Sequence, residues 1–277
     1  MSIPLEDLFN DVIAKSMRGL GLSDADLASK SGASAEAIAA AKSGAVDDAV
    51  LLKIAPHLNL HGPSLVTMAH NAWKPADASL PGLAQFNTTY HDMTVNAYLV
   101  WDAETKNAVA FDTGADAGPM IDFIEKHGLN LSLIFLTHTH PDHIMDLARL
   151  SADGAVTAFV HAREACASAK TFELGETESW ESGGLKIEPR STWGHSKGGI
   201  TYVVSGLEKP VAIVGDALFA SSMGGGMVSF SEALATNRKE IFTLPNHTVL
   251  CPGHGPLTTV GEEKAHNPFY PEFKEVF

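Results

Sequence analysis

Three histidines and one aspartate fall within seven residues, in the stretch THTHPDH at 137–143. It follows the apolar run LSLIFL, which is typical of a buried strand. Side chains alternate along a strand, so His138 and His140 should point the same way where the strand ends. Two imidazoles on one side can bind one metal ion. Asp142 and His143 come next, at the start of a predicted helix, where they could bind a second ion nearby.

Three later residues of the same chemical types also follow predicted strands. They are His195 in TWGHSKGG, Asp216 in AIVGDALF and His254 in CPGHGP. Active sites of open α/β sheets lie at such strand ends, so we expect these side chains to meet the THTHPDH stretch. Imidazole and carboxylate ligands without cysteine suit Zn²⁺, with Fe²⁺ or Mn²⁺ as alternatives. The predicted cofactor is a pair of divalent ions that share a carboxylate. The charge of the two ions lowers the pKa of a water bound between them to roughly 7.

These motifs resemble those of the metallo-β-lactamase superfamily. The tail GHGPLTTVGEEKAHNPF is similar to the glyoxalase II (hydroxyacylglutathione hydrolase) branch, and the resemblance extends from about Leu83 to Phe269. It implies an α/β fold, an αββα sandwich with the metals at one edge of two packed sheets. It also implies three sets of ligands: His138, His140 and His195 for the first metal; Asp142, His143 and His254 for the second; and Asp216 as the bridge.

Two aspartates receive further roles from the resemblance. Asp112, in FDTG, matches a strand-end aspartate of the family and is predicted to orient the ligands. The alternative interpretation of Asp112 is a turn-capping residue before Gly114. Asp142 is predicted to be catalytic, because it both binds a metal and aims the hydroxide at a carbonyl carbon.

The substrate is less well defined by the sequence. A thiolate leaves with little protonation, since a thiol pKa is roughly 8.5, which favours a thioester over an ester. In glyoxalase II the loop after the bridging aspartate usually carries a basic residue, but ASSMGGGMVSF contains none. A smaller or different acyl compound is therefore expected instead of hydroxyacylglutathione. Two alternatives share the ligands: a persulfide dioxygenase with one iron on His138, His195 and Asp216, and a lactonase, against which Phe219 argues by replacing the usual tyrosine.

The first 73 residues are predicted to form a helical module, followed by a linker at 74–82 and a catalytic domain at 83–277. The stretch LSDADLASKSGASAEAIAAAKSG resembles a helix-turn-helix. This gives an alternative to a purely enzymatic function, namely a DNA-binding regulator. Residues 1–60 contain five Lys and Arg against eight Asp and Glu, a net charge of −3 that repels phosphates. The module is instead expected to pack against the enzyme, to form a homo-oligomer contact or to cover the active-site mouth.

The bulk composition limits the partners further. The chain has 277 residues, two cysteines and a formal net charge of −14, so nucleic acid and anionic membranes are not expected to bind it. Neither a membrane span nor a secretory signal is recognisable. We therefore expect a cytoplasmic enzyme that acts on a small acyl molecule.

Overall fold

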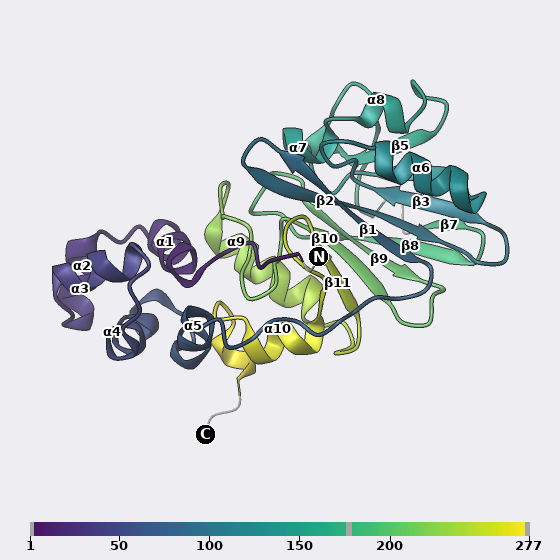
Figure 1. Ribbon diagram of the computed structural model, residues 1–277. Coiled ribbons are helices and arrows are strands. Elements are labelled where there is room, and N and C mark those ends of the chain that lie inside the picture. The colour runs from purple at the N-terminus through teal and green to yellow at the C-terminus, as the bar shows by residue number, and fades with distance from the viewer. Residues whose placement is uncertain (1–2, 176–178, 275–277) are drawn as a thin grey trace.

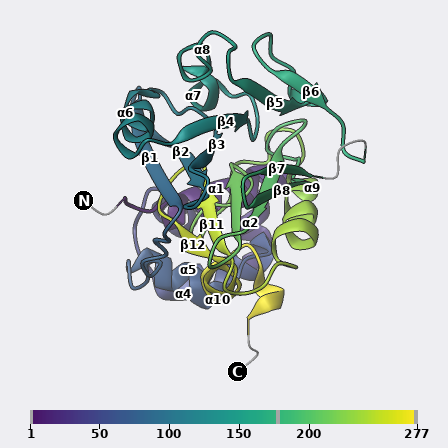
Figure 2. The same cartoon turned by 90° about the vertical axis from the view of Figure 1, so that its right-hand side faces the viewer.

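Two six-stranded sheets form the centre of the protein in the computed structural model, which describes residues 3–175 and 179–274. The first sheet contains, in spatial order, Leu83–Tyr90 (β1), Met93–Trp101 (β2), Asn107–Phe111 (β3), Asn130–Phe135 (β4), Thr157–His161 (β5) and Lys170–Phe172 (β6). The second contains Thr258–Thr259 (β12), Val249–Pro252 (β11), Val211–Gly215 (β10), Ile200–Ser205 (β9), Leu185–Ser191 (β8) and Trp180–Ser182 (β7). Figure 1 and Figure 2 show the two sheets from perpendicular directions.

Both sheets are mixed, because each contains parallel and antiparallel neighbours. In the first sheet β1, β2 and β3 are antiparallel, whereas β3 to β6 run parallel. In the second only β10 and β11 are a parallel pair. Strand β1 was not predicted from the sequence, because Gln85, Asn87 and two threonines give LAQFNTTY no apolar alternation.

Alternating side chains of the strands build the layers of the sandwich. Tyr98 and Val100 of β2 join an apolar cluster with Tyr202 and Ile213 of the second sheet, so this face lies between the sheets. The intervening Leu99 faces the other way, into a cluster that includes side chains of the outer helices. Those helices are Gly118–His127 (α6), Pro141–Ile144 (α7) and Leu147–Leu150 (α8). Gly128 ends α6 with a φ of 59°, a left-handed conformation that glycine adopts without a steric penalty.

The N-terminal part is helical as predicted. Its α-helices are Phe9–Leu20 (α1), Asp24–Ser31 (α2), Ala35–Lys42 (α3), Asp48–Ile54 (α4) and Gly62–Ala69 (α5), with the 3₁₀ turn Ala55–Leu58 between α4 and α5. Ser23 and Ser34 cap α2 and α3, because their side chains accept from the backbone amides of Asp26 and Ala37. The domain limits at 73, 74–82 and 83 stay a prediction.

The N-terminal helices share one apolar core with the outer face of the second sheet. Figure 1 shows them beside Phe230–Thr236 (α9) and Val260–His266 (α10), on the side away from α6. Phe230 of α9 packs directly on α1, where a Cβ added to Gly19 would lie 2.2 Å from its ring. The same cluster contains Met17 of α1 and Tyr270 near the C-terminus. Burial of this common core fixes the module to the catalytic part.

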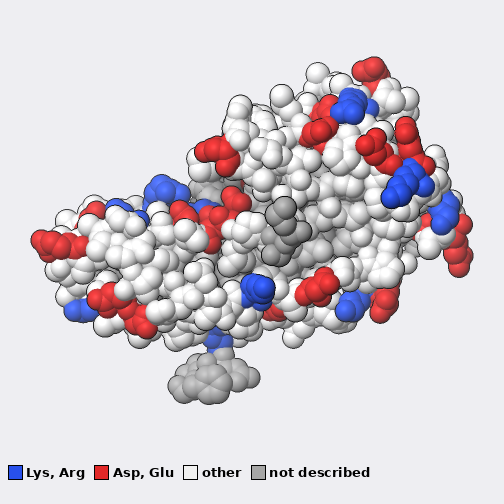
Figure 3. Space-filling model, viewed as in Figure 1, with Lys and Arg blue, Asp and Glu red and all other residues white. Residues whose placement is uncertain are grey.

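Acidic and basic side chains are interspersed over the face shown in Figure 3, including the surface of the N-terminal helices. None of the helices within the described ranges has the length and apolar character needed to cross a membrane. Most of the buried large apolar side chains belong to three clusters: one between the sheets, one under the outer helices, and one shared by the N-terminal helices and the second sheet.

Candidate metal centre

The predicted ligands lie at one end of the two sheets, on loops and on a one-turn helix that follow strands. They are His138 and His140 after β4, Asp142 and His143 in α7, His195 between β8 and β9, Asp216 after β10, and His254 after β11. Asp216 and His254 meet because β10 and β11 are parallel neighbours, so their following loops leave the sheet at the same edge. The helix predicted from Asp142 is short, and ends at Ile144.

Four ligand atoms form a first cluster. His140 Nδ1 lies 3.0 Å from His138 Nε2 and 3.0 Å from His195 Nε2. Asp216 Oδ2 lies 3.3 Å from His195 Nε2 and 3.9 Å from His138 Nε2. Three ring nitrogens and one carboxylate oxygen thus surround one point, a donor set that Zn²⁺ or Fe²⁺ accepts.

Asp142, His143 and His254 form a second cluster next to the first. Asp142 Oδ2 lies 3.5 Å from His143 Nε2 and 3.4 Å from His254 Nε2. Asp216 faces this cluster as well, with Oδ1 3.3 Å from His143 Nε2 and Oδ2 3.6 Å from His254 Nε2. The carboxyl group of Asp216 therefore lies between two groups of potential ligands.

In three of the histidines, the contact made by Nδ1, on the side away from the centre, determines which ring nitrogen carries the hydrogen. Each Nδ1 contacts an oxygen that only accepts: Asp112 Oδ2 at 2.9 Å for His143, Gly225 O at 2.9 Å for His195, and Thr94 O at 2.6 Å for His254. In the neutral ring the hydrogen must then be on Nδ1, and Nε2 presents its lone pair to the centre. Each ring is thus held in the tautomer that binds a metal.

Asp112 connects the two clusters. Its carboxylate accepts from the Thr137 amide at 2.7 Å, from Thr137 Oγ1 at 2.8 Å and from His143 Nδ1 at 2.9 Å. Because the Thr137 hydroxyl donates to Asp112, its oxygen is left to accept from His138 Nδ1, 3.0 Å away. Asp112 is buried, has a φ of 56°, and its side-chain hydrogen bonds within the described residues go to these groups and not to the turn at Gly114. These contacts support the orienting role over the turn-capping one.

Burial and charge act in opposite directions on the clustered groups. Burial opposes ionisation of Asp216, but His143, His254 and His195 outweigh it and hold its pKa well below the ordinary value. Burial also lowers the pKa of His143 and His254, yet Asp216 and its neighbours raise them to about 10 and about 11. Burial and the neighbouring rings lower the pKa of His138 well below its usual value, so that ring is neutral. The carboxylates therefore create a strong preference for positive charge in the centre.

Two buried atoms in the centre are placed where a bound cation would supply the partner that they lack among the described residues. Within the described residues His143 Nε2 and Asp216 Oδ1 make no hydrogen bond of good geometry, although they are 3.3 Å apart. A buried polar atom without a partner is costly, and coordination to an ion supplies one. Gly253 keeps the space free, because a Cβ there would lie 2.1 Å from Asp216 Oδ1. The donor set, the tautomers and the unpaired atoms all fit two divalent ions.

Glu164 is a supporting residue that the sequence analysis missed. Its Oε2 accepts from Thr139 Oγ1 at 2.8 Å and from the Thr139 amide at 3.2 Å, and its Oε1 accepts from the Gly198 amide at 2.7 Å. It joins the loop that carries His138 and His140 to the loop that carries His195. No local pattern marks Glu164, because its partners are distant in the sequence.

Fold and site together define a metal-dependent enzyme of a known superfamily. The family model described as "Metallo-beta-lactamase superfamily" matches residues 92–254. The chain belongs to this superfamily, and the fold and family predicted from the motifs are confirmed. Members are generally hydrolases and bind divalent metals, so the chain is a metallohydrolase of this superfamily.

Particular relatives are similar at moderate identity. A "Probable metallo-hydrolase" of Streptococcus pyogenes is 30% identical over 212 residues, which cover 67% of this chain and 89% of that protein. "Hydroxyacylglutathione hydrolase GloC" of Haemophilus influenzae is 29% identical over 197 residues, covering 63% and 92%. The solved structure of TTHA1623 "in a di-iron-bound form" matches with a TM-score of 0.54 and 26% identity, covering 66% of this chain and 99% of that one.

Proposed function

We propose that the chain is a binuclear metallohydrolase that cleaves a thioester or ester of a small acyl compound. The observation that carries the proposal is the position of Asp216 between two ligand clusters, with one buried oxygen unpaired among the described residues. His138, His140 and His195 would hold one ion, Asp142, His143 and His254 the other, and Asp216 both. Ions bound there would supply an ionised water near neutral pH and Lewis acidity toward a carbonyl oxygen.

We assign Asp142 a second role besides metal binding, namely orienting the attacking water. Asp142 directs Oδ2 toward the two histidines of its cluster, which leaves Oδ1 to accept a hydrogen bond from the attacking water and to orient it. Burial opposes ionisation of Asp142, but the hydrogen bond and charge of His254 keep its pKa below the ordinary value. A group in this state accepts a hydrogen bond well and is a poor proton donor.

The groups in the centre favour a leaving group that departs without a proton. The seven titratable side chains that converge in the centre are all placed as ligands, so a reaction that needs no general acid suits them best. A thiolate leaves unprotonated near neutral pH, whereas an alkoxide requires a proton. The similarity to a hydroxyacylglutathione hydrolase also supports a thioester. We propose Zn²⁺ as the metal, with Fe²⁺ as the alternative that the di-iron relative supports.

The test combines metal analysis with a substrate panel. Purified protein should contain two divalent ions per chain and release thiol from a simple thioester. Asp216→Ala should lose at least one ion and its turnover, because the shared ligand is gone. Asp122→Ala, an exposed aspartate on α6, is the matched control and should keep both. Full activity of the Asp216 variant would contradict the proposal. So would activity confined to cyclic esters (lactones) or to oxygen-consuming cleavage of a persulfide, with no open-chain ester or thioester hydrolysed.

The remaining expectations for partners and location stay predictions. They are the absence of nucleic-acid binding, a homo-oligomer contact through the N-terminal module, and a cytoplasmic location. A gel shift with duplex DNA at low salt tests the first. Tight binding there would favour the regulator hypothesis.

A further inference from the structure

Three consecutive glycines at 224–226 lie in the loop after β10 that begins with Asp216. Glycine has more backbone freedom than any other residue, because it has no Cβ. This run must nevertheless stay in one place, since the carbonyl of its middle residue, Gly225, accepts from His195 Nδ1 at 2.9 Å. Gly224 is tightly placed as well: an added Cβ would lie 1.9 Å from the Asp216 carbonyl oxygen and 2.9 Å from His195 Nδ1. Contacts at the two ends of the run must therefore fix it.

The end after the glycines is held by the loop that carries His195. The amides of Val228 and Ser229 both donate to the carbonyl of Gly194, each at 3.0 Å. Gly194 directly precedes His195, so this end of the run is connected to the ligand that the run supports.

The end before the glycines is held by a lysine of the N-terminal module. Lys15 of α1 donates from Nζ to the Met223 carbonyl at 2.8 Å, although 208 positions separate the two residues. The same Nζ donates to Asp7 Oδ2 at 2.5 Å and lies 5.1 Å from the centre of the Phe219 ring, a favourable cation–π arrangement. The Lys15 side chain is only 13% exposed and Met223 is buried, so water competes little for these contacts.

Phe219 extends the contacts of Lys15 to the second ligand cluster. Its ring meets the His254 ring edge to face, with the ring centres 5.5 Å apart. Phe219 and Ser222 exchange two backbone hydrogen bonds, of 3.1 and 3.0 Å, which close this part of the loop into a tight turn. Ser222 Oγ also donates to Asp7 Oδ2. The ion pair of Lys15 and Asp7 therefore contacts both ends of a turn that packs on His254.

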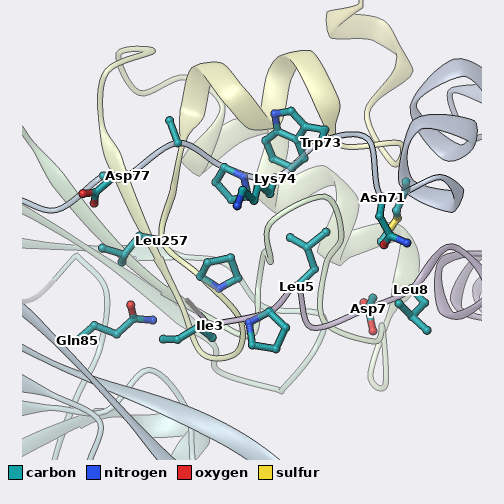
Figure 4. Close-up of a pocket in the computed structure, with 16 residues that line it drawn as sticks. Ile3, Leu5, Asp7, Leu8, Asn71, Trp73, Lys74, Asp77, Gln85 and Leu257 are labelled. Atoms are coloured by element: carbon teal, nitrogen blue, oxygen red, sulfur yellow. The ribbon is translucent and has the colours of Figure 1, made fainter. Parts of the chain in front are cut away.

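Asp7 is not closely packed on every side. It lines a cavity of about 710 Å³ that extends along the segment at residues 3–8 and is bounded opposite by Trp73 and Lys74, as Figure 4 shows. None of the seven proposed ligands lines this cavity, so it is separate from the metal centre. Because Asp7 adjoins open space on this flank, its hydrogen bonds to Lys15 and Ser222 supply the connection to the loop.

We propose that Lys15 is a positioning residue of the metal centre. It fixes the glycine run so that the Gly225 carbonyl holds the hydrogen of His195 on Nδ1, which keeps the lone pair of Nε2 directed at the first cluster. The inference rests on the function proposed above, because it takes His195 as a metal ligand. It gives the N-terminal helices, which lie outside the region matched by the family model, a part in metal binding.

Replacing Lys15 by methionine tests the proposal, because methionine has a similar length and no hydrogen to donate. Lys15→Met should bind one of two Zn²⁺ ions about tenfold more weakly in a competition titration, the lower end of the effect expected for groups that orient metal ligands. In ¹⁵N spectra of the zinc-loaded protein, the Nδ1 hydrogen of His195 should exchange with water faster than in the wild type. Lys42→Met is the matched control and should change neither quantity, since Lys42 pairs with Asp24 at 2.6 Å at the end of the module away from the sheets (Figure 1).

A double variant separates positioning from stability. Lys15→Met leaves the buried Asp7 carboxylate without a counter-charge, which by itself lowers the melting temperature. Adding Asp7→Asn removes that charge, and the asparagine carbonyl can still accept from Ser222. The double variant should melt closer to the wild type than Lys15→Met, yet retain the weaker ion binding and the faster exchange at His195.

The role of Lys15 is overturned if the double variant regains wild-type metal affinity, or if Lys15→Met never loses it. An equal loss in Lys42→Met would overturn it as well. These measurements need no substrate, so absence of turnover in a wild type that binds both ions would contradict the proposed function alone.

Discussion

Replacing Asp112 by asparagine tests whether one buried carboxylate sets the tautomers of two proposed ligands. The Asn carbonyl can take the Oδ1 position and keep the Thr137 amide, 2.7 Å away. The NH₂ group then occupies the Oδ2 position and donates to His143 Nδ1 and to Thr137 Oγ1. His143 must respond by carrying its hydrogen on Nε2, and the Thr137 hydroxyl turns to donate to His138 Nδ1. Both rings would then direct an N–H at the centre.

The opposite orientation of the asparagine does not avoid the conflict. Its NH₂ group would face the Thr137 amide, and two donors would meet in a buried place at a cost of about 1–3 kcal/mol. Loss of a partner that orients a metal ligand typically weakens metal binding about 10–100-fold. At about 1.4 kcal/mol for each factor of ten, this loss of metal affinity is about 1.4–2.8 kcal/mol, which is of the same size as the hydrogen-bond cost.

The assay is a competition titration of metal-free protein with Zn²⁺ and a chromogenic chelator at neutral pH. Asp112→Asn should bind at least one ion 10–100-fold more weakly, and ¹⁵N spectra should show a changed imidazole tautomer. Asp116→Asn is the control, since Asp116 is an exposed partner of Arg149 and makes no contact with the ligands. Wild-type affinity for both ions, with unchanged imidazole signals in a folded Asp112→Asn protein, would refute this account of the relay.

Two further substitutions probe supporting carboxyl groups. Glu164→Gln places its NH₂ group against a backbone donor, at Gly198 or at Thr139, and should lower the free energy of unfolding by about 1–3 kcal/mol and reduce kcat/KM. The control Glu181→Gln changes an exposed residue and should alter neither quantity. Equal melting curves for the wild type and both variants would count against the supporting role of Glu164. Burial raises the pKa of Glu263 to about 7, so its contribution to stability is complete below its ordinary value of 4.5 and is lost as pH rises toward 7 and above. In Glu263→Gln the amide oxygen can keep accepting from Ser221 and Asn267, and the NH₂ group faces the Thr258 hydroxyl, which donates to Glu263 in the wild type and can turn to accept. This variant should therefore gain about 3 kcal/mol relative to the wild type between pH 4.5 and 8 in denaturant titrations, and a pH-independent difference would contradict the assignment.

The sequence predicted the parts of the site that depend on local spacing. Alternation after a strand placed His138 and His140 together, and the strand-end rule placed Asp216 and His254 at the same edge. The family resemblance supplied the division into two clusters and the position of Asp112. The contacts of Asp112 with Thr137 and His143 were found only in the structure, because they depend on how β3 and β4 align.

Contacts between distant segments could not be predicted in the same way. Glu164 meets Gly198 across 34 positions, and Asp7 meets Ser222 across 215, with no periodic pattern to mark either pair. Strand β1 was missed because a half-buried strand at a sheet edge needs few apolar residues. The expectation that the N-terminal module packs against the enzyme agrees with the shared core, but the surface that it covers followed only from the folded chain.

The core common to α1, α9 and the C-terminal residues also limits how this protein could have evolved. Phe9, Phe230 and Tyr270 belong to one apolar cluster although they come from opposite ends of the chain. A catalytic half inherited without its helices would present that face to water, and a foreign module would have to match its shape. Recombination at 74–82 would therefore succeed only between parents with complementary faces, so the two halves are expected to descend as a pair.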